Sequence, residues 1–251
     1  MQVSHAGVLP LKIEAAAYVV ESNQVTLWQS DEHKALPPAS LTKIMTALLV
    51  LEHYAPESLV TISREAANET GTRLPLKAGS QIKAKDLLAA TVVQSANDSC
   101  HALAELVSAN QAKFVTLMNQ RAKEWHLTDT HFSNACGHDD PQHFSSAHDL
   151  AILANKAIAN PAFLKLASTR EMTIATVDGK QRFKLQNSNA LLGRYEGATG
   201  LKTGYTPKAG KCLIAYATRN GVNILLVLLN APNRWWDASD TLDYAFQHAT
   251  H

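Results

Sequence analysis

The 251-residue chain has 46% hydrophobic and 18% charged residues, the composition of an ordinary globular protein, which excludes a disordered or fibrous one. Its 23 lysines and arginines balance 22 acidic residues, and a net charge of +1 gives no electrostatic basis for binding nucleic acid or a membrane surface. No apolar run approaches the roughly 20 residues that would cross a bilayer, so we expect no membrane segment.

The first residues, Met1–Gly7, have neither a basic start nor a long apolar core, so they do not form a signal peptide. Composition fits either a cytosolic protein or the mature form of a secreted one. Cys100, Cys136 and Cys212 form no CxxC pair, which argues against a zinc-finger site and a disulfide framework; one bridge with one free thiol stays open. The eleven histidines include no HExxH motif, and we predict neither a catalytic metal nor a cofactor.

Strands and one long helix are predicted in the first quarter of the chain. Ala15–Trp28 predicts two strands around the polar turn Glu21–Gln24. Pro37 and Pro38 then precede an apolar helix pattern over Ser40–His53. The middle of the chain is predicted to be helical at about residues 84–93, 98–107, 113–125 and 147–159.

From Glu171 onward the pattern returns to strands. They are predicted over residues 172–177 and 181–185, and then in a hairpin over 211–218 and 222–229 before a closing helix over about 236–248. Strand segments therefore stand at both ends of the chain with helices between them. The economical solution is an α/β fold of the α+β type, in which both ends build one antiparallel sheet packed by the first and last helices.

We expect one catalytic domain over residues 1–251. Its sheet lobe takes in about residues 1–60 and 165–251, and an inserted helical lobe takes in about residues 61–164. The cleft between the lobes is the default place for an active site.

Three short motifs occur in order along the chain: Ser40-Leu-Thr-Lys43, Ser95-Ala-Asn97 and Lys202-Thr-Gly204. Each is weak alone, and Ser80–Lys83 and Ser108–Asn110 repeat the first two patterns. Context separates them. Ser40 opens an apolar helix and Lys43 lies one turn on, so the amine can reach the hydroxyl. The Ser80 pattern lies in a polar stretch that resembles a solvated helix start.

The other two motifs also stand at favourable places. Ser95–Asn97 lies between two helices, where a turn can project side chains into a cleft, whereas Ser108–Asn110 trails off a helix end. Lys202–Gly204 precedes the final hairpin and can lie along a sheet edge, where the glycine lets a substrate backbone approach. Taken singly, Ser40 could be only a helix cap and Lys202–Gly204 only a turn.

Together, the three motifs are typical of penicillin-binding proteins and class A β-lactamases. The chain resembles the D-alanyl-D-alanine carboxypeptidase group of low-molecular-mass penicillin-binding proteins over about residues 15–248. The resemblance rests on the segments 38–46, 94–98, 130–134, 143–151 and 200–206. It implies the penicillin-binding and serine β-lactamase-like fold.

Two departures from the family pattern concern local shape. The usual Asn-x-x-Gly-Leu becomes Asn134-Ala-Cys-Gly-His138, and a glycine after the middle helix is replaced by His126. The C-terminal β-domain and amphipathic anchor of many members have no counterpart in this sequence.

The resemblance implies an acyl-transfer site. Ser40 is expected to be the nucleophile, Lys43 its base and Ser95 the proton shuttle, with Lys202 beside it and Asn97 holding a substrate amide. The resemblance further implies an oxyanion hole at the backbone N–H groups of Ser40 and Tyr205. The terminal carboxylate of the substrate is expected to meet cationic and hydroxyl groups. The predicted substrate-binding residues are Thr203, Gly204, Tyr205, Thr206 and Arg234.

The expected activity is therefore removal of the terminal D-alanine from peptidoglycan stem peptides, with β-lactams as covalent inhibitors and a periplasmic or other extracytoplasmic location. Three alternatives remain. A D,D-endopeptidase would use the same residues on cross-links. A class A β-lactamase would need a Glu-x-x-Leu-Asn motif, but the nearest match, Glu124–Thr128, ends in threonine. A non-catalytic penicillin-binding domain would not need the complete set of Ser40, Lys43, Ser95, Asn97 and Lys202.

Overall fold

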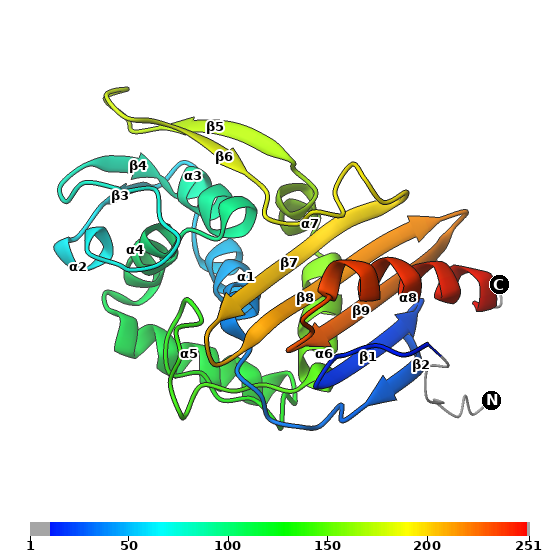
Figure 1. Cartoon of the computed structure of the whole chain (residues 1–251). Helices are drawn as coiled ribbons and strands as arrows, with labels where there is room; N and C mark the ends of the chain where they lie inside the picture. Colours follow the sequence, from blue (N-terminus) through cyan, green and yellow to red (C-terminus); the bar gives the residue numbers. More distant parts are fainter. Residues whose placement is uncertain (1–10, 250–251) are drawn as a thin grey trace.

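The computed structural model describes residues 11–249, so the predicted character of Met1–Gly7 lies outside the described residues. Its centre is a five-stranded antiparallel sheet in the order β2-β1-β9-β8-β7 (Figure 1). The strands are β1 (Ala17–Ser22), β2 (Val25–Ser30), β7 (Ala198–Thr206), β8 (Gly210–Arg219) and β9 (Val222–Leu229). Because β1 pairs with β9 from Ala17↔Leu229 onward, both ends of the chain build one sheet, as predicted.

Both faces of the sheet are covered by helices. The closing helix α8 (Arg234–His248) packs on β8 and β9, and α6 (Ala147–Ile158) packs on β1 and β9 from the other side (Figure 1). The β1 side chains alternate accordingly: Tyr18 and Val20 join the core under α8, whereas Ala17 and Val19 join the larger core on the opposite face. A strand covered on both sides needs apolar residues at nearly every position, which explains the Val-Asn-Ile-Leu-Leu-Val-Leu-Leu sequence of β9.

The predicted helix that begins at Ser40 is divided in two. A 3₁₀ turn, η1 (Ala39–Thr42), comes first, and α1 begins only at Lys43 and runs to His53. Helix α1 is buried along most of its length and contacts α4, α6 and α7. The sequence correctly placed the apolar segment but not its first turn.

The remaining elements lie around this core. The predicted helix at 84–93 is α3 (Ala84–Ala89) followed by a π-helical turn, η2 (Ala90–Gln94). The others are α2 (Arg64–Ala67), α4 (Asn97–Ser108), α5 (Gln111–Glu124), α7 (Pro161–Ala167), the strand pair β3 (Leu59–Thr61) and β4 (Gln81–Lys83), and the strand pair β5 (Glu171–Ala175) and β6 (Arg182–Gln186). Sequence patterns missed α2, α7, β3, β4 and β7, which are short or interrupted by glycine and polar residues.

No helix within residues 11–249 combines the length and apolar character that crossing a membrane requires.

Candidate active site

The first motif forms a contact between a serine and a buried lysine. Ser40 lies in η1, and Lys43 is the first residue of α1. In a 3₁₀ turn, side chains at i and i+3 eclipse one another, so Ser40 and Lys43 lie on the same side. Lys43 Nζ is 3.0 Å from Ser40 Oγ, and the Lys43 side chain is fully buried. The structure therefore brings the predicted pair together, through a 3₁₀ turn and not through the α-helix start that we expected.

Two further acceptors orient the Lys43 amine. Its Nζ donates to Asn97 Oδ1 at 2.7 Å and to the Cys136 carbonyl oxygen at 2.5 Å. Burial lowers the pKa of Lys43 well below its ordinary value, and the charge of Lys202 lowers it further. A neutral lysine amine is a proton acceptor, so this environment suits a general base.

The second motif is positioned by an irregular helix. The π-helical turn η2 ends at Ser95, which has a left-handed backbone (φ 65°), and α4 begins two residues later at Asn97. This break turns the chain so that Ser95 and Asn97 both face the buried lysines. Asn97 also donates through Nδ2 to the Thr70 carbonyl oxygen at 2.6 Å, which fixes the direction of its amide oxygen toward Lys43.

The third motif lies on β7, an edge strand of the sheet, as predicted. Lys202 is buried, and its Nζ donates to Ser95 Oγ at 2.9 Å and to the Thr203 carbonyl oxygen at 3.0 Å. Burial and, to a smaller extent, Arg234 lower the pKa of Lys202 to about 7. A Cβ on Gly204 would meet the Pro38 carbonyl oxygen at 3.1 Å, so glycine allows β7 to lie directly against η1.

The predicted carboxylate-binding residues have different surroundings. Thr203 Oγ1 lies 2.5 Å from Ser188 Oγ, while Thr206 Oγ1 donates to Asp139 Oδ1 at 2.5 Å. Thr206 is thus engaged by an acidic side chain that the sequence reasoning did not consider. Tyr205 is largely exposed beside them.

Arg234 is tied to the motif strand. Its Nη1 donates to the Gly204 carbonyl oxygen at 2.7 Å and to the Cys212 carbonyl oxygen at 3.1 Å, and its guanidinium lies over the Trp235 ring at 4.7 Å. Arg234 therefore braces the backbone of β7 and β8 as well as bordering the cleft. The aromatic stacking that we considered for a surface arginine is present, but so is the contact with the motif.

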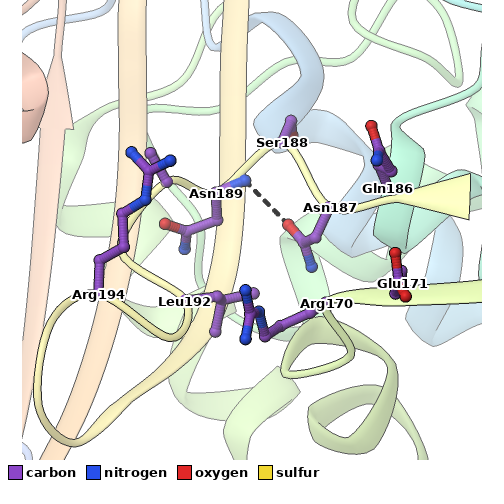
Figure 2. A pocket seen from close by; sticks show the side chains of 9 residues that line it. Arg170, Glu171, Gln186, Asn187, Ser188, Asn189, Leu192 and Arg194 are labelled. Carbon is purple, nitrogen blue, oxygen red and sulfur yellow. Dashed lines mark hydrogen bonds between the residues drawn. The ribbon is translucent and has the colours of Figure 1, made fainter.

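These residues border a cavity of about 530 Å³. Its lining residues are Ser40, Thr72, Gln94, Ser95, Lys184, Gln186, Ser188, Thr203, Gly204, Tyr205 and Arg234. Lys43, Asn97 and Lys202 lie behind this wall and bond to its serines. Gln94 lies next to the second motif. The motifs gave no indication of Thr72, Lys184, Gln186 or Ser188, because these residues come from segments that only the folded chain brings to the cleft. A second cavity of about 590 Å³ shares Gln186 and Ser188 with the first (Figure 2).

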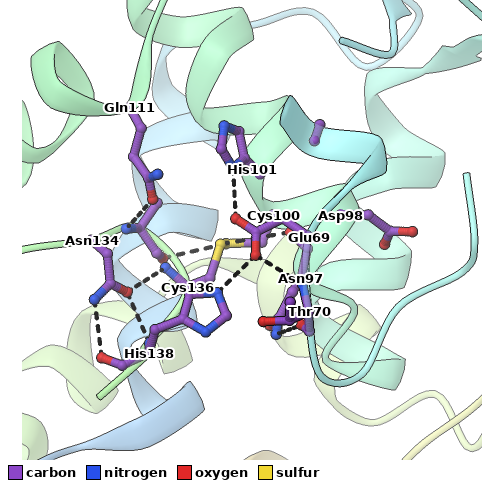
Figure 3. Close-up of polar contacts among 12 residues, drawn as sticks. Glu69, Thr70, Asn97, Asp98, Cys100, His101, Gln111, Asn134, Cys136 and His138 are labelled. Atoms are coloured by element: carbon purple, nitrogen blue, oxygen red, sulfur yellow. Dashed lines mark hydrogen bonds and ion pairs between the residues drawn. A yellow bond between two sulfur atoms is a disulfide. The ribbon is translucent and has the colours of Figure 1, made fainter. Parts of the chain in front are cut away.

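The segment 134–138, in which His138 replaces the family's usual leucine, forms one cluster with Glu69 and α4 (Figure 3). Cys136 forms a disulfide with Cys100 of α4, which decides the pairing that the sequence left open, and Cys212 is free and buried. The backbone N–H groups of residues 136, 137 and 138 all donate to Asn134 Oδ1. This loop therefore presents the Cys136 carbonyl to Lys43.

Glu69 links the same loop to α4. It accepts hydrogen bonds from His101 Nδ1 at 2.6 Å and His138 Nε2 at 2.9 Å (Figure 3). Burial by itself would raise the pKa of Glu69, but the contacts with the two histidines outweigh it and hold the pKa well below its ordinary value. The resulting carboxylate favours the charged form of Lys43, against the effect of burial.

One group of three side chains among residues 11–249 has the spacing of metal ligands. His33, Asp129 and His148 place one ligand atom each within 4.8 Å of the others. His33 Nδ1 already contacts Asp129 Oδ2 at 2.7 Å, and none of the three lines the cleft. The arrangement around Ser40 does not draw on them.

Comparisons with known proteins agree with this geometry. A family model for D-alanyl-D-alanine carboxypeptidases (Peptidase S11) matches residues 3–233. The chain is 33% identical to the D-alanyl-D-alanine carboxypeptidase DacF of Bacillus subtilis and 35% identical to DacD of Escherichia coli, over 95% and 88% of this chain. It spans only 63% and 60% of the length of these two curated relatives.

Solved structures show the same fold. The D-alanyl-D-alanine carboxypeptidase of Mycobacterium tuberculosis aligns with a TM-score of 0.90 at 29% identity, over 100% of this chain and 98% of that one. DacD of Francisella tularensis aligns with a TM-score of 0.88 at 26% identity, over 94% of this chain and 71% of that one. With its three motifs gathered at one cleft and the family model matched over most of its length, the chain belongs to the D-alanyl-D-alanine carboxypeptidase family of peptidases.

Proposed function

We propose that the protein is a serine D-alanyl-D-alanine carboxypeptidase that removes the terminal D-alanine of peptidoglycan stem peptides, and that β-lactams acylate the same serine. The observation that carries the proposal is the contact of 3.0 Å between Ser40 Oγ and the fully buried Lys43 amine. A buried amine of lowered pKa beside a hydroxyl is the arrangement that activates a serine nucleophile.

In the first step, Lys43 accepts the hydroxyl proton while Ser40 Oγ attacks the carbonyl carbon between the two D-alanines. The oxyanion accepts hydrogen bonds from the backbone N–H groups of Ser40 and Tyr205. The close approach of β7 to η1 at Gly204 supports this pair of donors. The C–N bond then breaks, and an ester forms on Ser40. The proton reaches the leaving amine through Ser95 Oγ, which Lys202 Nζ holds at 2.9 Å.

In the second step, water attacks the ester carbonyl while Lys43 accepts its proton. The ester C–O bond then breaks, and Lys43 passes this proton to Ser40 Oγ, so that the serine hydroxyl is restored and the shortened peptide is released as its carboxylate. The bond of 2.7 Å between Asn97 Oδ1 and Lys43 Nζ supports a role of Asn97 in orienting the base, and we also assign Asn97 the role of holding a substrate amide. The terminal carboxylate of the substrate lies near Thr203 and Arg234, where the guanidinium supplies positive charge at this end of the cleft. Gly204 and Thr206 complete this side of the proposed substrate site.

The location and domain organisation are also proposals. A peptidoglycan hydrolase acts outside the cytoplasmic membrane, so we place the protein in the periplasm or an equivalent compartment, with a role in cell wall formation and cell shape. The disulfide between Cys100 and Cys136 supports an oxidising compartment. We regard residues 1–251 as one catalytic domain, with sheet and helical lobes divided as the sequence suggested.

A class A β-lactamase has less support. Glu124, the glutamate of the nearest matching motif, ends α5, and its carboxylate accepts from Arg121 and Gln120. It does not line the cleft, and neither does any other acidic residue between positions 11 and 249.

The test is product analysis on two separate substrates. We expect release of D-alanine from a pentapeptide at least about tenfold faster than cleavage of a D,D-cross-linked dimer, a difference of roughly 1.4 kcal/mol in activation free energy. Ser40→Ala should abolish both reactions and the labelling of the protein by penicillin. If the dimer is consumed while the pentapeptide stays intact, the protein is a D,D-endopeptidase that uses the same Ser40 chemistry, and the carboxypeptidase proposal is wrong.

A further inference from the structure

The second cavity continues from the cleft on the side of the leaving group. In the proposed reaction the leaving amine takes its proton from Ser95, beside Lys202 and Thr203. Ser188 Oγ lies 2.5 Å from Thr203 Oγ1 and borders both cavities (Figure 2). The space beyond Ser188 is therefore reached from the leaving-group side of the scissile bond.

This space is much larger than the proposed leaving group requires. It has a volume of about 590 Å³, whereas D-alanine is a single small amino acid that the first cavity already accommodates. It lies between the start of the β5–β6 hairpin and the loop that leads to β7.

The wall of this cavity is cationic. Arg170 and Arg194 both line it, and within residues 11–249 neither guanidinium has a hydrogen-bond or ion-pair partner (Figure 2). Glu171 also lines it; its carboxylate pairs with Lys184 Nζ at 2.8 Å, and the charge of Arg170 also lowers the pKa of this carboxylate. Two positive charges remain for a ligand.

Arg170 is held in place by the opposite loop. A Cβ on Gly193 would come within 2.8 Å of Arg170 Cζ, so the guanidinium lies directly against the glycine backbone. Gly193 has φ of 71°, which glycine adopts without strain. The loop thus leaves room for this guanidinium.

A buried amide gives the independent indication of a ligand. Asn189 lines the cavity with only 3% of its surface exposed, and its Nδ2 has no hydrogen-bond partner. Its Oδ1 accepts from the Leu191 N–H at 3.0 Å, so the loop fixes the side-chain orientation. A buried donor without an acceptor is costly, and an acceptor-bearing ligand would satisfy it.

We propose that this second cavity binds a neighbouring stem peptide through its carboxylates, with Arg170, Arg194 and Asn189 as the binding residues. In a D,D-cross-link the leaving amine belongs to such a second peptide, which carries carboxylates of its own. Guanidinium groups and an amide N–H are suitable donors to carboxylates. The inference rests on the proposed function, because that function defines the side of the leaving group.

The experiment measures binding to Ser40→Ala, which cannot cleave its ligands. Fluorescence anisotropy compares a labelled D,D-cross-linked peptide dimer with a labelled pentapeptide. The dimer should bind at least about tenfold more tightly, and Arg170→Ala combined with Arg194→Ala should remove most of that advantage. The affinity for the pentapeptide should stay within about twofold.

Two matched variants separate charge from general damage. Arg64→Ala removes an exposed arginine of α2, outside both cavities, and should leave the dimer affinity unchanged. Asn189→Asp keeps the acceptor for Leu191 but replaces the donor by a charge, so it should weaken only the dimer. Amidating the carboxylates of the second peptide should have the same effect, because it removes their charge.

Equal affinities for dimer and pentapeptide would overturn the inference, as would a dimer advantage that persists in the double arginine variant or after amidation. Release of D-alanine from the pentapeptide by the unmodified enzyme tests the proposed function separately. If no D-alanine were released, the anisotropy result could still be interpreted. If the dimer bound no more tightly than the pentapeptide, the carboxypeptidase proposal would be unaffected.

Discussion

The chain contains the Ser-x-x-Lys spacing twice, and the two copies have opposite surroundings. Lys43 is fully buried, and its Nζ lies 3.0 Å from Ser40 Oγ. The side chain of Lys83 is 41% exposed and pairs with Glu57 at 2.7 Å, while Ser80 Oγ donates to a backbone carbonyl. Only the first copy contains a serine bonded to its lysine.

Backbone geometry produces this difference. Ser40 and Lys43 span a 3₁₀ turn, which stacks residues three apart on one side. Lys83 ends the strand β4, and residues three apart along an extended segment point to opposite faces. The four-residue pattern therefore specifies a reactive pair only where the chain is helical and the lysine enters the core.

Exchanging each lysine for arginine should give the largest contrast. Lys43→Arg keeps the charge, but a guanidinium does not lose its proton, so the base is removed. We expect acylation by a chromogenic β-lactam to slow by about 10²–10⁴-fold, measured as the burst rate. Lys83→Arg should acylate at the normal rate. A normal burst in Lys43→Arg would show that another group is the base.

The disulfide next to Lys43 tests how far the buried pair depends on its neighbours. Cys136→Ser should lower the free energy of unfolding by about 2–4 kcal/mol, because the cross-link restricts the unfolded chain. It should also slow acylation, since the Cys136 carbonyl accepts from Lys43 Nζ. Denaturant titration and burst kinetics provide the two measurements.

A reducing agent provides the control for this prediction. Dithiothreitol should impair the unmodified protein and Cys212→Ala equally, because Cys212 takes no part in the bridge, and should leave Cys136→Ser unaffected. Acylation that stays fast after complete reduction would show that the loop does not position Lys43.

A substitution of Arg234 tests whether this end of the cleft binds the substrate carboxylate. A charge-assisted bond to a carboxylate contributes roughly 1.5–3 kcal/mol, so Arg234→Ala should lower kcat/KM for free-carboxylate peptides by about ten- to hundredfold. The same peptides amidated at the C-terminus should lose much less. Equal losses would assign Arg234 only its observed role of bracing the Gly204 and Cys212 carbonyls.

The smallest effect concerns pH and stability. The pKa of Lys202 is lowered to about 7 in the folded protein, from an ordinary 10.5. Between these values the unfolded chain binds a proton that the folded protein does not, so stability rises with pH and is lost as pH falls toward 7. Lys202 should contribute up to about 1.4 kcal/mol per pH unit between pH 7.5 and 9.

Denaturant titrations at several pH values measure that slope. Lys202→Met should flatten it relative to the unmodified protein, and Lys83→Met should not, because Lys83 is exposed. An unchanged slope in Lys202→Met would mean that Lys202 is not neutral near pH 8 in the folded state.

Much of the fold followed from periodicity, because a strand or helix that enters the core must repeat its apolar positions. The pairing of both chain ends was predictable in this way, whereas β7 was not, since Gly200, Lys202 and Gly204 interrupt its pattern. The left-handed backbone at Ser95 was not predictable from the sequence either, because tertiary packing and not local sequence holds a serine in that conformation.

The site residues were predictable where a motif names them, but their supporting contacts were not. The long-range partners of Glu69 and of Cys136 lie 32 to 93 positions away along the chain, and one sequence contains no information on such contacts. The engagement of Thr206 by Asp139 is of the same kind, at a separation of 67. The replacement of leucine by His138 was visible in the sequence, but only the fold showed that His138 contacts Glu69 and that the Cys136 carbonyl accepts from Lys43.

The pairing of β1 with β9 also constrains the order in which the protein can assemble. Strand β1 leaves the ribosome before its partner β9, which follows more than 190 residues later along the chain. Closing so long a loop is slow, and β7, against which η1 packs, is also translated late. A nascent chain released before β9 should therefore hold an unreactive serine and show no labelling by penicillin.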